Sequence, residues 1–298
     1  VSCLEHNAVM RPLRKLAKQD VSFTQARVYP GDNDATVDAF RRALRPETKL
    51  IVCTHVSNVW GIRLPVERIA AMARQYGVPI CVDAAQSAGV FPVELEEGCF
   101  DFICAAPHKG LYAPMGLGLL ITSRGEALDT ILEGGTGTNS VSFDQPQEMP
   151  ERLESGTLNV PAVAGLRAGL SFVREKSRKR ILHHELSVAR AAWRALRALD
   201  RVELFSPEPD GESFAPVFSF RVRGVPSEET AAALAQAGIA VRAGLHCAPA
   251  AHRFMGTLES GAVRICPSAF TTEQEIRSFA AVMRSVVRNS QDVHKERL

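Results

Sequence analysis

Short apolar runs without polar alternation are the feature of this 298-residue sequence that most constrains its fold. A segment of helical spacing at 64–77, with Pro65 near its start and Gly77 at its end, separates two of these runs. Strands buried on both faces have this continuous apolar pattern, and parallel strands joined by helices are its usual setting. We therefore expect an α/β fold with a mainly parallel sheet covered by helices, its strands lying at 49–55, 78–84, 101–106 and 116–122.

The second half of the sequence has a different pattern. One long helix or two helices are expected over 161–199, followed by a loop at 206–213. Shorter strands and helices come next, and Thr272 with Glu275 predicts a capping box at the start of the last helix. We expect a large domain over 1–160, then a linking helix and a smaller C-terminal α+β domain over 161–298.

Charge and cysteine content exclude several classes of protein. The 35 basic and 33 acidic residues leave a net charge of +2, so no basic field indicates nucleic-acid binding, and the basic run at 174–180 is interpreted as a solvated helix face. No apolar run is long enough to cross a bilayer.

Seven cysteines without a C-x-x-C pair argue against a disulfide framework or a zinc ribbon, and we expect a cytoplasmic protein without a metal site. Three cysteines fall in strand-like runs and are expected in the core: Cys53, Cys81 and Cys104.

Polar residues that follow the apolar runs suggest a functional site. Taken alone, Lys109 after the run 101–106 is best interpreted as a surface lysine, and Asp83 at the end of the run 78–84 as a cap or a satisfied polar group. The carboxyl ends of parallel strands, however, meet at one edge of a sheet. An imine-forming lysine, a carboxylate for a pyridine nitrogen and a hydrogen-bond donor such as Gln86 are what pyridoxal phosphate requires.

Six motifs then suggest a family. The sequences EHNAV, THVSNVWG, VDAAQS, PHKG, ESGTLN and VRAGLHCAP resemble the cysteine desulfurase and selenocysteine lyase branch of the class V aminotransferases, from residue 5 to about 285. The resemblance implies the pyridoxal phosphate fold type I and conversion of L-cysteine to L-alanine with an enzyme-bound persulfide. It leaves L-selenocysteine open as an alternative substrate.

The resemblance also implies roles for individual residues. Arg264 would bind the substrate carboxylate through two hydrogen bonds, and Arg242 would position the substrate or the adjoining loop. His6 is also a candidate for proton transfer. The implied cofactor contacts are His6 stacked on the ring, Asn58 near its phenolic oxygen and the substrate, Asp83 at the pyridine nitrogen, Gln86 at the phenolic oxygen, His108 at the phosphate, and Lys109 as the covalent attachment.

Two further expectations follow from the same resemblance. Thr136 and Thr138, in GGTGT, would reach the phosphate of a partner subunit, so a homodimer is expected. Cys247 would be the nucleophile that accepts sulfur, with nearby cations or His246 supporting its thiolate, and a sulfur-acceptor protein could follow it. Without the resemblance, Cys247 would be interpreted as a small residue of a turn.

The match is incomplete at the phosphate. The family carries a Thr-containing turn upstream of the EH motif, whereas this sequence begins four residues before Glu5, and Ala106 stands where a hydroxyl residue is common. Losing two or three charge-assisted hydrogen bonds, each worth about 1.5–3 kcal/mol, would weaken cofactor binding. Two alternatives therefore stay open: a class V enzyme with a different reaction, and a truncated or non-catalytic paralogue that dimerises or accepts sulfur.

Overall fold

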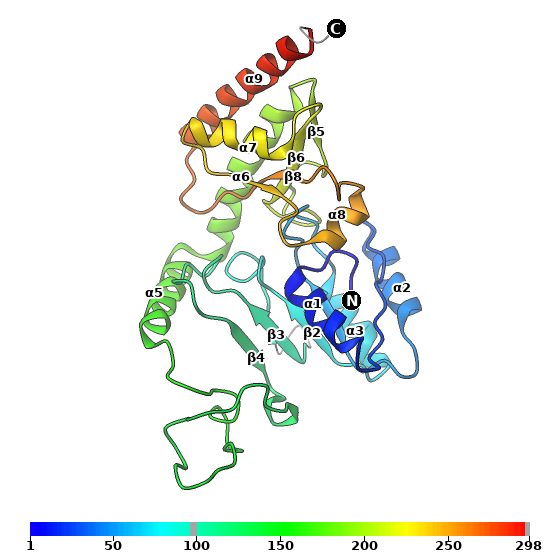
Figure 1. Ribbon diagram of the computed structural model, residues 1–298, viewed down its shortest axis with the longest axis vertical. Helices are drawn as coiled ribbons and strands as arrows, with labels where there is room; N and C mark the ends of the chain where they lie inside the picture. The colour runs from blue at the N-terminus through cyan, green and yellow to red at the C-terminus, as the bar shows by residue number, and fades with distance from the viewer. Residues whose placement is uncertain (96–99, 296–298) are drawn as a thin grey trace.

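Two four-stranded sheets organise the computed structural model, which describes residues 1–95 and 100–295 (Figure 1). The first sheet has the order β1-β2-β3-β4, with parallel pairing of β1 to β2 and of β2 to β3, and antiparallel pairing of β3 to β4. The mainly parallel sheet of the sequence-based prediction is thereby confirmed. Its strands are β1 (Ile51–Thr54), β2 (Ile80–Asp83), β3 (Phe102–Ala105) and β4 (Leu119–Thr122).

The second sheet is antiparallel throughout and has the order β5-β6-β8-β7. It is the small α+β unit expected in the second half of the sequence, although the domain boundary at residue 160 stays a prediction. Its strands are β5 (Val202–Leu204), β6 (Phe218–Val222), β7 (Arg242–Gly244) and β8 (Ala262–Ile265).

The helices begin and end where local signals place them. Gly77, with φ +65°, follows the last turn of α3, and Ser177, with φ +63°, separates α5 from α6 in the segment where one or two helices were expected. The capping box is confirmed, because Thr272 Oγ1 accepts from Glu275 N while a Glu275 carboxylate oxygen accepts from Thr272 N. The helices are α1 (Asn7–Leu16), α2 (Asn33–Ala43), α3 (Val66–Gln75), α5 (Val160–Lys176), α6 (Arg178–Arg197), α7 (Ser227–Gln236), α8 (Pro249–Met255) and α9 (Glu273–Lys295), with a 3-10 turn at Gly125–Ala127.

Each sheet has its own apolar core, and the segment after β1 joins the two. Trp60 is fully buried against α8, where its Nε1 donates to Ala251 O at 2.9 Å. Ser219 Oγ of β6 donates to Val59 O at 2.7 Å, and Ala215 N donates to Gly61 O at 2.8 Å. These bonds fix the small sheet and α8 over one end of the first sheet.

Burial of the first sheet is uneven. The expected core position of Cys53 is confirmed, since its side chain is fully buried. Cys81 and Cys104, also expected in the core, are only half-buried. Cys99 lies outside the described residues. On β4, Leu120 and Ile121 are 49% and 45% exposed. Within the described residues, β4 at the end of the sheet is therefore less covered than the parallel strands.

No helix among residues 1–95 and 100–295 is long and apolar enough to cross a membrane. A cytoplasmic location stays a prediction.

Candidate functional site

The carboxyl end of β2 presents Asp83. Its Oδ1 accepts a hydrogen bond from Ala85 N at 2.9 Å, which fixes the orientation of the carboxylate. The backbone of this residue also accepts from His55 N at 2.9 Å. A rigid carboxylate at this sheet edge is what the sequence predicted.

A glycine pair brings Lys109 to the turn that carries Gln86. A Cβ atom on Gly110 would lie 2.4 Å from Ala88 O, and one on Gly89 would lie 1.9 Å from Gly110 O. The two turns therefore pack backbone against backbone, which only glycine permits at these positions. As a result, Lys109 and Gln86 line the same cavity.

The charges of the site act on one another. Burial lowers the pKa of the Lys109 amine, and the Asp83 carboxylate opposes this shift. Burial, followed by the Lys109 cation, lowers the pKa of His6, while Asp83 again opposes. Arg242 and Arg264 lower the pKa of His6 further. These mutual effects place the predicted residues within electrostatic reach of one another, and burial shifts the pKa of Lys109 in the direction of a more nucleophilic amine.

His6 links the start of α1 to the site. As the N-cap of α1, its Nδ1 accepts from Ala8 N at 3.0 Å, so the orientation of the ring is set. The neighbouring Asn7 N donates to Cys247 O at 2.7 Å. The EHNAV segment therefore contacts the cysteine loop directly.

The Cys247 loop is held in an unusual backbone conformation. His246 and Cys247 both have positive φ angles, +50° and +57°. Asn58 Nδ2 donates to His246 O at 2.9 Å, and Arg242 Nη2 approaches the Cys247 sulfur at 3.7 Å. The thiol is exposed, so a substrate or an acceptor can reach it.

The cation beside this thiol is Arg242 and not His246. The His246 ring is buried, and its Nε2 lies 3.0 Å from Ala262 O. Burial lowers the pKa of His246 to about 3, so the ring is neutral. Of the two alternatives expected to support the thiolate, a nearby cation or His246, the structure therefore favours the cation.

The two predicted arginines are cross-strand neighbours. The register of β7 and β8 places Arg242 directly opposite Arg264, so both side chains emerge from the same face of the sheet. Arg264 Nη1 donates to Asn58 O at 2.9 Å. Two adjacent guanidinium groups beside Lys109 can bind a carboxylate.

A cavity of about 260 Å³ joins Lys109, Gln86 and Arg264 to residues that sequence analysis missed. Glu185 is buried in its wall, and Tyr112 Oη donates to Glu185 Oε1 at 3.4 Å. Burial raises the pKa of Glu185 to about 7 and that of Tyr112 to about 12. One signal could have identified Glu185, because Ile181, Glu185 and Ala189 fall on one helical stripe with four-residue spacing.

A second missed carboxyl lies behind Asp83. Glu5 is fully buried, where its Oε1 accepts from Thr54 N at 3.0 Å and from Ser2 Oγ. Burial raises its pKa to about 7, and the nearby Asp83 raises it further. Its position inside the EHNAV motif was the available signal.

The predicted phosphate contacts are not gathered at Lys109. His108 is exposed beside it. Thr136 and Thr138 bond to each other, with their hydroxyl oxygens 3.1 Å apart, in the segment between the 3-10 turn and α5. Figure 1 shows this segment protruding beyond β4, away from α8 and α1.

Comparisons with known proteins agree on one family. The model of the family Aminotransferase class-V matches residues 1–279. A probable cysteine desulfurase of Synechocystis sp. is 28% identical over 289 residues, covering 96% of this chain and 68% of the relative. A probable cysteine desulfurase of Xylella fastidiosa is 31% identical over 291 residues, with 96% and 68% covered.

Two solved structures have the same fold. The apo cysteine desulfurase of Thermococcus onnurineus NA1 superimposes with a TM-score of 0.88 at 30% identity, covering 97% of this chain and 72% of that one. The cysteine desulfurase CsdA of Escherichia coli gives a TM-score of 0.87 at 26% identity, with 98% and 71% covered.

Proposed function

Because the chain belongs to the class-V aminotransferase family, we propose that it is a pyridoxal phosphate-dependent cysteine desulfurase. The observation that carries this proposal is an exposed Cys247 thiol beside Arg242, on a loop bonded to Asn58 in the segment after β1. The cysteine desulfurases among its relatives support the same reaction.

The residues present fit the ring and aldehyde end of pyridoxal phosphate. Lys109 would hold the aldehyde carbon, Asp83 the pyridine nitrogen and Gln86 the phenolic oxygen. Three observations support these roles. The pKa of Lys109 is lowered, the Asp83 carboxylate is oriented by its bond from Ala85 N, and Lys109 and Gln86 line the same cavity. When bound, the cofactor supplies an electron sink that makes the α-carbon of an amino acid acidic.

The arginine pair and Asn58 would orient the substrate. Arg264, held by its bond to Asn58 O, would bind the carboxylate of the amino acid, with Arg242 opposite it on β7. The Lys109 amine would then take the proton from the α-carbon, and His6 would be a second group that moves a proton. The arginine pair would bind the carboxylate of L-selenocysteine in the same way.

Cys247 would perform the sulfur transfer. Its sulfur attacks the sulfur of the substrate, the new S–S bond leaves a persulfide on Cys247, and the electron pair of the broken C–S bond stays with the carbon. After protonation of that carbon the product is L-alanine, so one thiol and one L-cysteine yield one persulfide and one L-alanine. The exposed loop leaves that persulfide open to a sulfur-acceptor protein.

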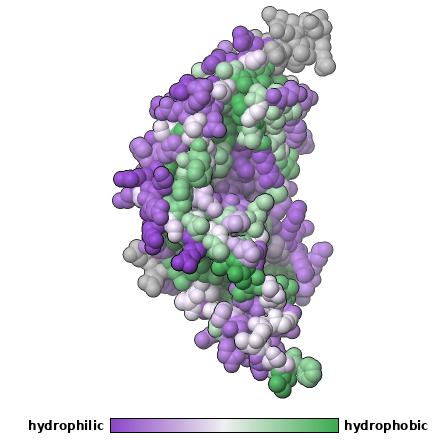
Figure 2. Space-filling view, turned by 90° about the vertical axis from the view of Figure 1, so that its left-hand side faces the viewer, coloured by the Kyte–Doolittle hydropathy of each residue, from purple (hydrophilic) through white to green (hydrophobic). Residues whose placement is uncertain are grey.

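We further propose that the working enzyme is a homodimer. In the protruding segment, Ile131, Val141 and Phe143 are 95%, 94% and 108% exposed, and Figure 2 shows hydrophobic surface at this tip of the molecule. Burial of this tip on a second copy would bring Thr136 and Thr138 to the neighbouring phosphate position.

The test is release of L-alanine and sulfide from L-cysteine by the purified chain with added pyridoxal phosphate and dithiothreitol, which reduces the Cys247 persulfide to the thiol and sulfide. We expect a yellow complex and turnover, both lost in Lys109→Ala. Cys247→Ser should keep the yellow complex but lose L-alanine release and the persulfide. The thiol control Cys81→Ala should keep the yellow complex, L-alanine release and the persulfide. A yellow complex with turnover that survives Cys247→Ser would indicate a different reaction. No complex at saturating cofactor, also in the protein made from the native open reading frame, would indicate a non-catalytic paralogue.

A further inference from the structure

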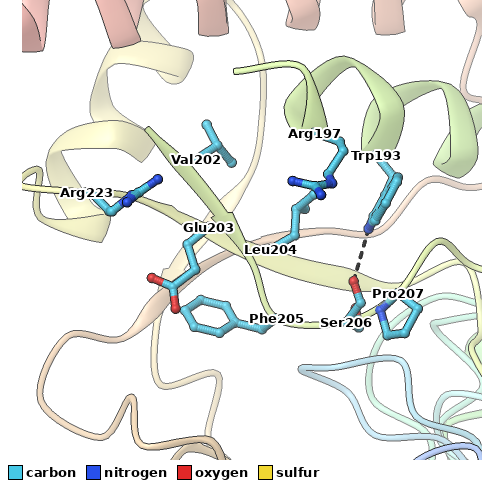
Figure 3. Close-up of a pocket in the computed structure, with 9 residues that line it drawn as sticks. All are labelled: Trp193, Arg197, Val202, Glu203, Leu204, Phe205, Ser206, Pro207 and Arg223. Atoms are coloured by element: carbon cyan, nitrogen blue, oxygen red, sulfur yellow. Dashed lines mark hydrogen bonds between the residues drawn. The ribbon is translucent and has the colours of Figure 1, made fainter. Parts of the chain in front are cut away.

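A second concave site lies on the small sheet, between β5 and the end of α6 (Figure 3). The groove has a volume of about 710 Å³ and shares no lining residue with the cavity at Lys109. It is lined by Trp193, Arg197, Val202, Glu203, Leu204, Phe205, Ser206, Pro207 and Arg223.

The strand that forms its floor is a sheet edge. β5 pairs only with β6 among the described strands. Phe205 N donates to Ser219 O and Arg223 N to Arg201 O, so the odd-numbered residues of β5 carry the bonds to β6. The peptide N–H and C=O of Leu204 therefore point away from β6, as does the C=O of Val202. A row of such groups is a template for an added strand.

The groove has basic groups on both sides and an apolar end. Figure 3 shows the guanidinium groups of Arg197 and Arg223 on either side of Val202, with the Trp193 ring beside Arg197 and Pro207 next to Ser206. Within the described part of the chain, neither guanidinium pairs with a carboxylate.

The acid in the groove is already neutralised. Glu203 pairs with Arg221 at 2.7 Å, and Arg223 donates to the backbone oxygen of Asp200. Two guanidinium groups thus face the groove without a counter-ion, which favours an anionic occupant.

We propose that this groove binds an extended acidic segment of a partner protein as a fifth strand on β5. Acidic side chains of the segment lie at Arg197 and Arg223, and an apolar side chain lies against Trp193 and Pro207. The segment pairs with the outward peptide groups of Val202 and Leu204. Since none of these residues belongs to the Lys109 site, the inference is independent of the proposed function.

Two labelled peptides test it, because the strand direction is open. Their sequences are Asp-Glu-Asp-Val-Leu-Phe and its reverse, capped at both ends, and binding to the full chain is followed by fluorescence anisotropy. We expect one of them to bind and its Lys-Lys-Lys counterpart not to bind. The double variant Arg197→Glu with Arg223→Glu should lower the affinity at least about tenfold.

A matched control separates a local site from bulk charge. Arg284→Glu with Arg288→Glu makes the same change of charge on exposed positions of α9 and should leave the affinity unchanged. Leu204→Pro removes the outward N–H, a substitution that edge strands tolerate, and should also weaken binding while the circular dichroism spectrum is retained.

Three results would overturn the proposal. They are the absence of binding by both peptides, equal weakening by the α9 control, and unchanged affinity in Leu204→Pro. If the protein made from the native open reading frame fails to bind a peptide that the 298-residue chain binds, a segment of the same protein fills the groove, and the partner assignment is wrong.

Discussion

Glu185 is a buried acid that the proposed reaction does not use. Burial raises its pKa from 4.5 to about 7, so the folded state binds a proton more tightly than the unfolded state does. Its contribution to stability is therefore fully present below about pH 4.5 and is lost as the pH rises through 7.

Glu185→Gln should remove this loss. The amide can still accept the Tyr112 hydroxyl, so at pH 8 we expect the variant to be more stable than the parent by roughly 1–3 kcal/mol, with no such gain at pH 5. Urea unfolding at pH 5, 6.5 and 8 measures the difference. Glu259→Gln on the surface is the control, and a gain for Glu185→Gln that is equal at all three pH values contradicts the assignment.

Asn58 acts on Cys247 through one hydrogen bond. Asn58→Ala removes the donor to His246 O, worth about 1 kcal/mol, while Arg264 can still donate to the backbone of residue 58. We expect amide hydrogen exchange at residues 245–248 to become about fivefold faster, a readout that needs neither cofactor nor substrate. Unchanged exchange there would mean that Asn58 does not hold the loop.

At the scale of elements, the packing of two turns decides where Lys109 lies. Gly110→Ala would place a methyl group 2.4 Å from Ala88 O, so the turn carrying Lys109 must move away from Gln86. We expect weaker binding of pyridoxal phosphate, by about tenfold or more, and a lower unfolding temperature. Absorption titration measures the binding. Gly118→Ala, at a position with open space around it and outside the proposed phosphate segment, is the control and should change neither quantity.

The elements themselves could largely be predicted from the sequence, because their signals are local. The spacing of 64–77 predicted α3, and the pair Thr272 and Glu275 predicted the start of α9. The strand ends likewise predicted that Asp83 and Lys109 would meet, since parallel strands share a carboxyl edge.

The remaining features depend on contacts between distant segments. Asn58 bonds to a residue 188 positions away, and no local pattern reports which polar group will receive its amide. His246 adjoins Cys247 in sequence, yet the pairing of β7 with β8 turns its ring toward Ala262. The exposure of β4 also escaped prediction, because an apolar run does not report what covers it.

At the scale of the whole molecule, the site lies where the two sheets meet. The end of β2 supplies the acid, and the turn after β3 supplies the lysine. β7 and β8 supply the two arginines, and the loop before α8 supplies the cysteine. Thr136 and Thr138, the expected phosphate contacts, lie on the segment that protrudes beyond β4, away from α1 and α8 (Figure 1). In the proposed homodimer, a second copy would bring those hydroxyls to the site.

The proposed homodimer predicts that dimerisation is a condition for tight cofactor binding. Replacing both Ile131 and Phe143 with Asp puts charges on the two exposed apolar positions of the tip, where burial on a second copy would desolvate them. We expect a dimer for the parent chain and a monomer for this variant by light scattering, with pyridoxal phosphate bound at least about tenfold more weakly because phosphate donors are lost.

Tyr76→Asp, on an exposed apolar residue at the end of α3, is the matched control and should stay dimeric. Two outcomes contradict the argument. A parent chain that is monomeric yet binds the cofactor tightly would show that the hydroxyls of the tip are not needed. A monomeric variant that retains full affinity would show that Thr136 and Thr138 do not reach the neighbouring phosphate.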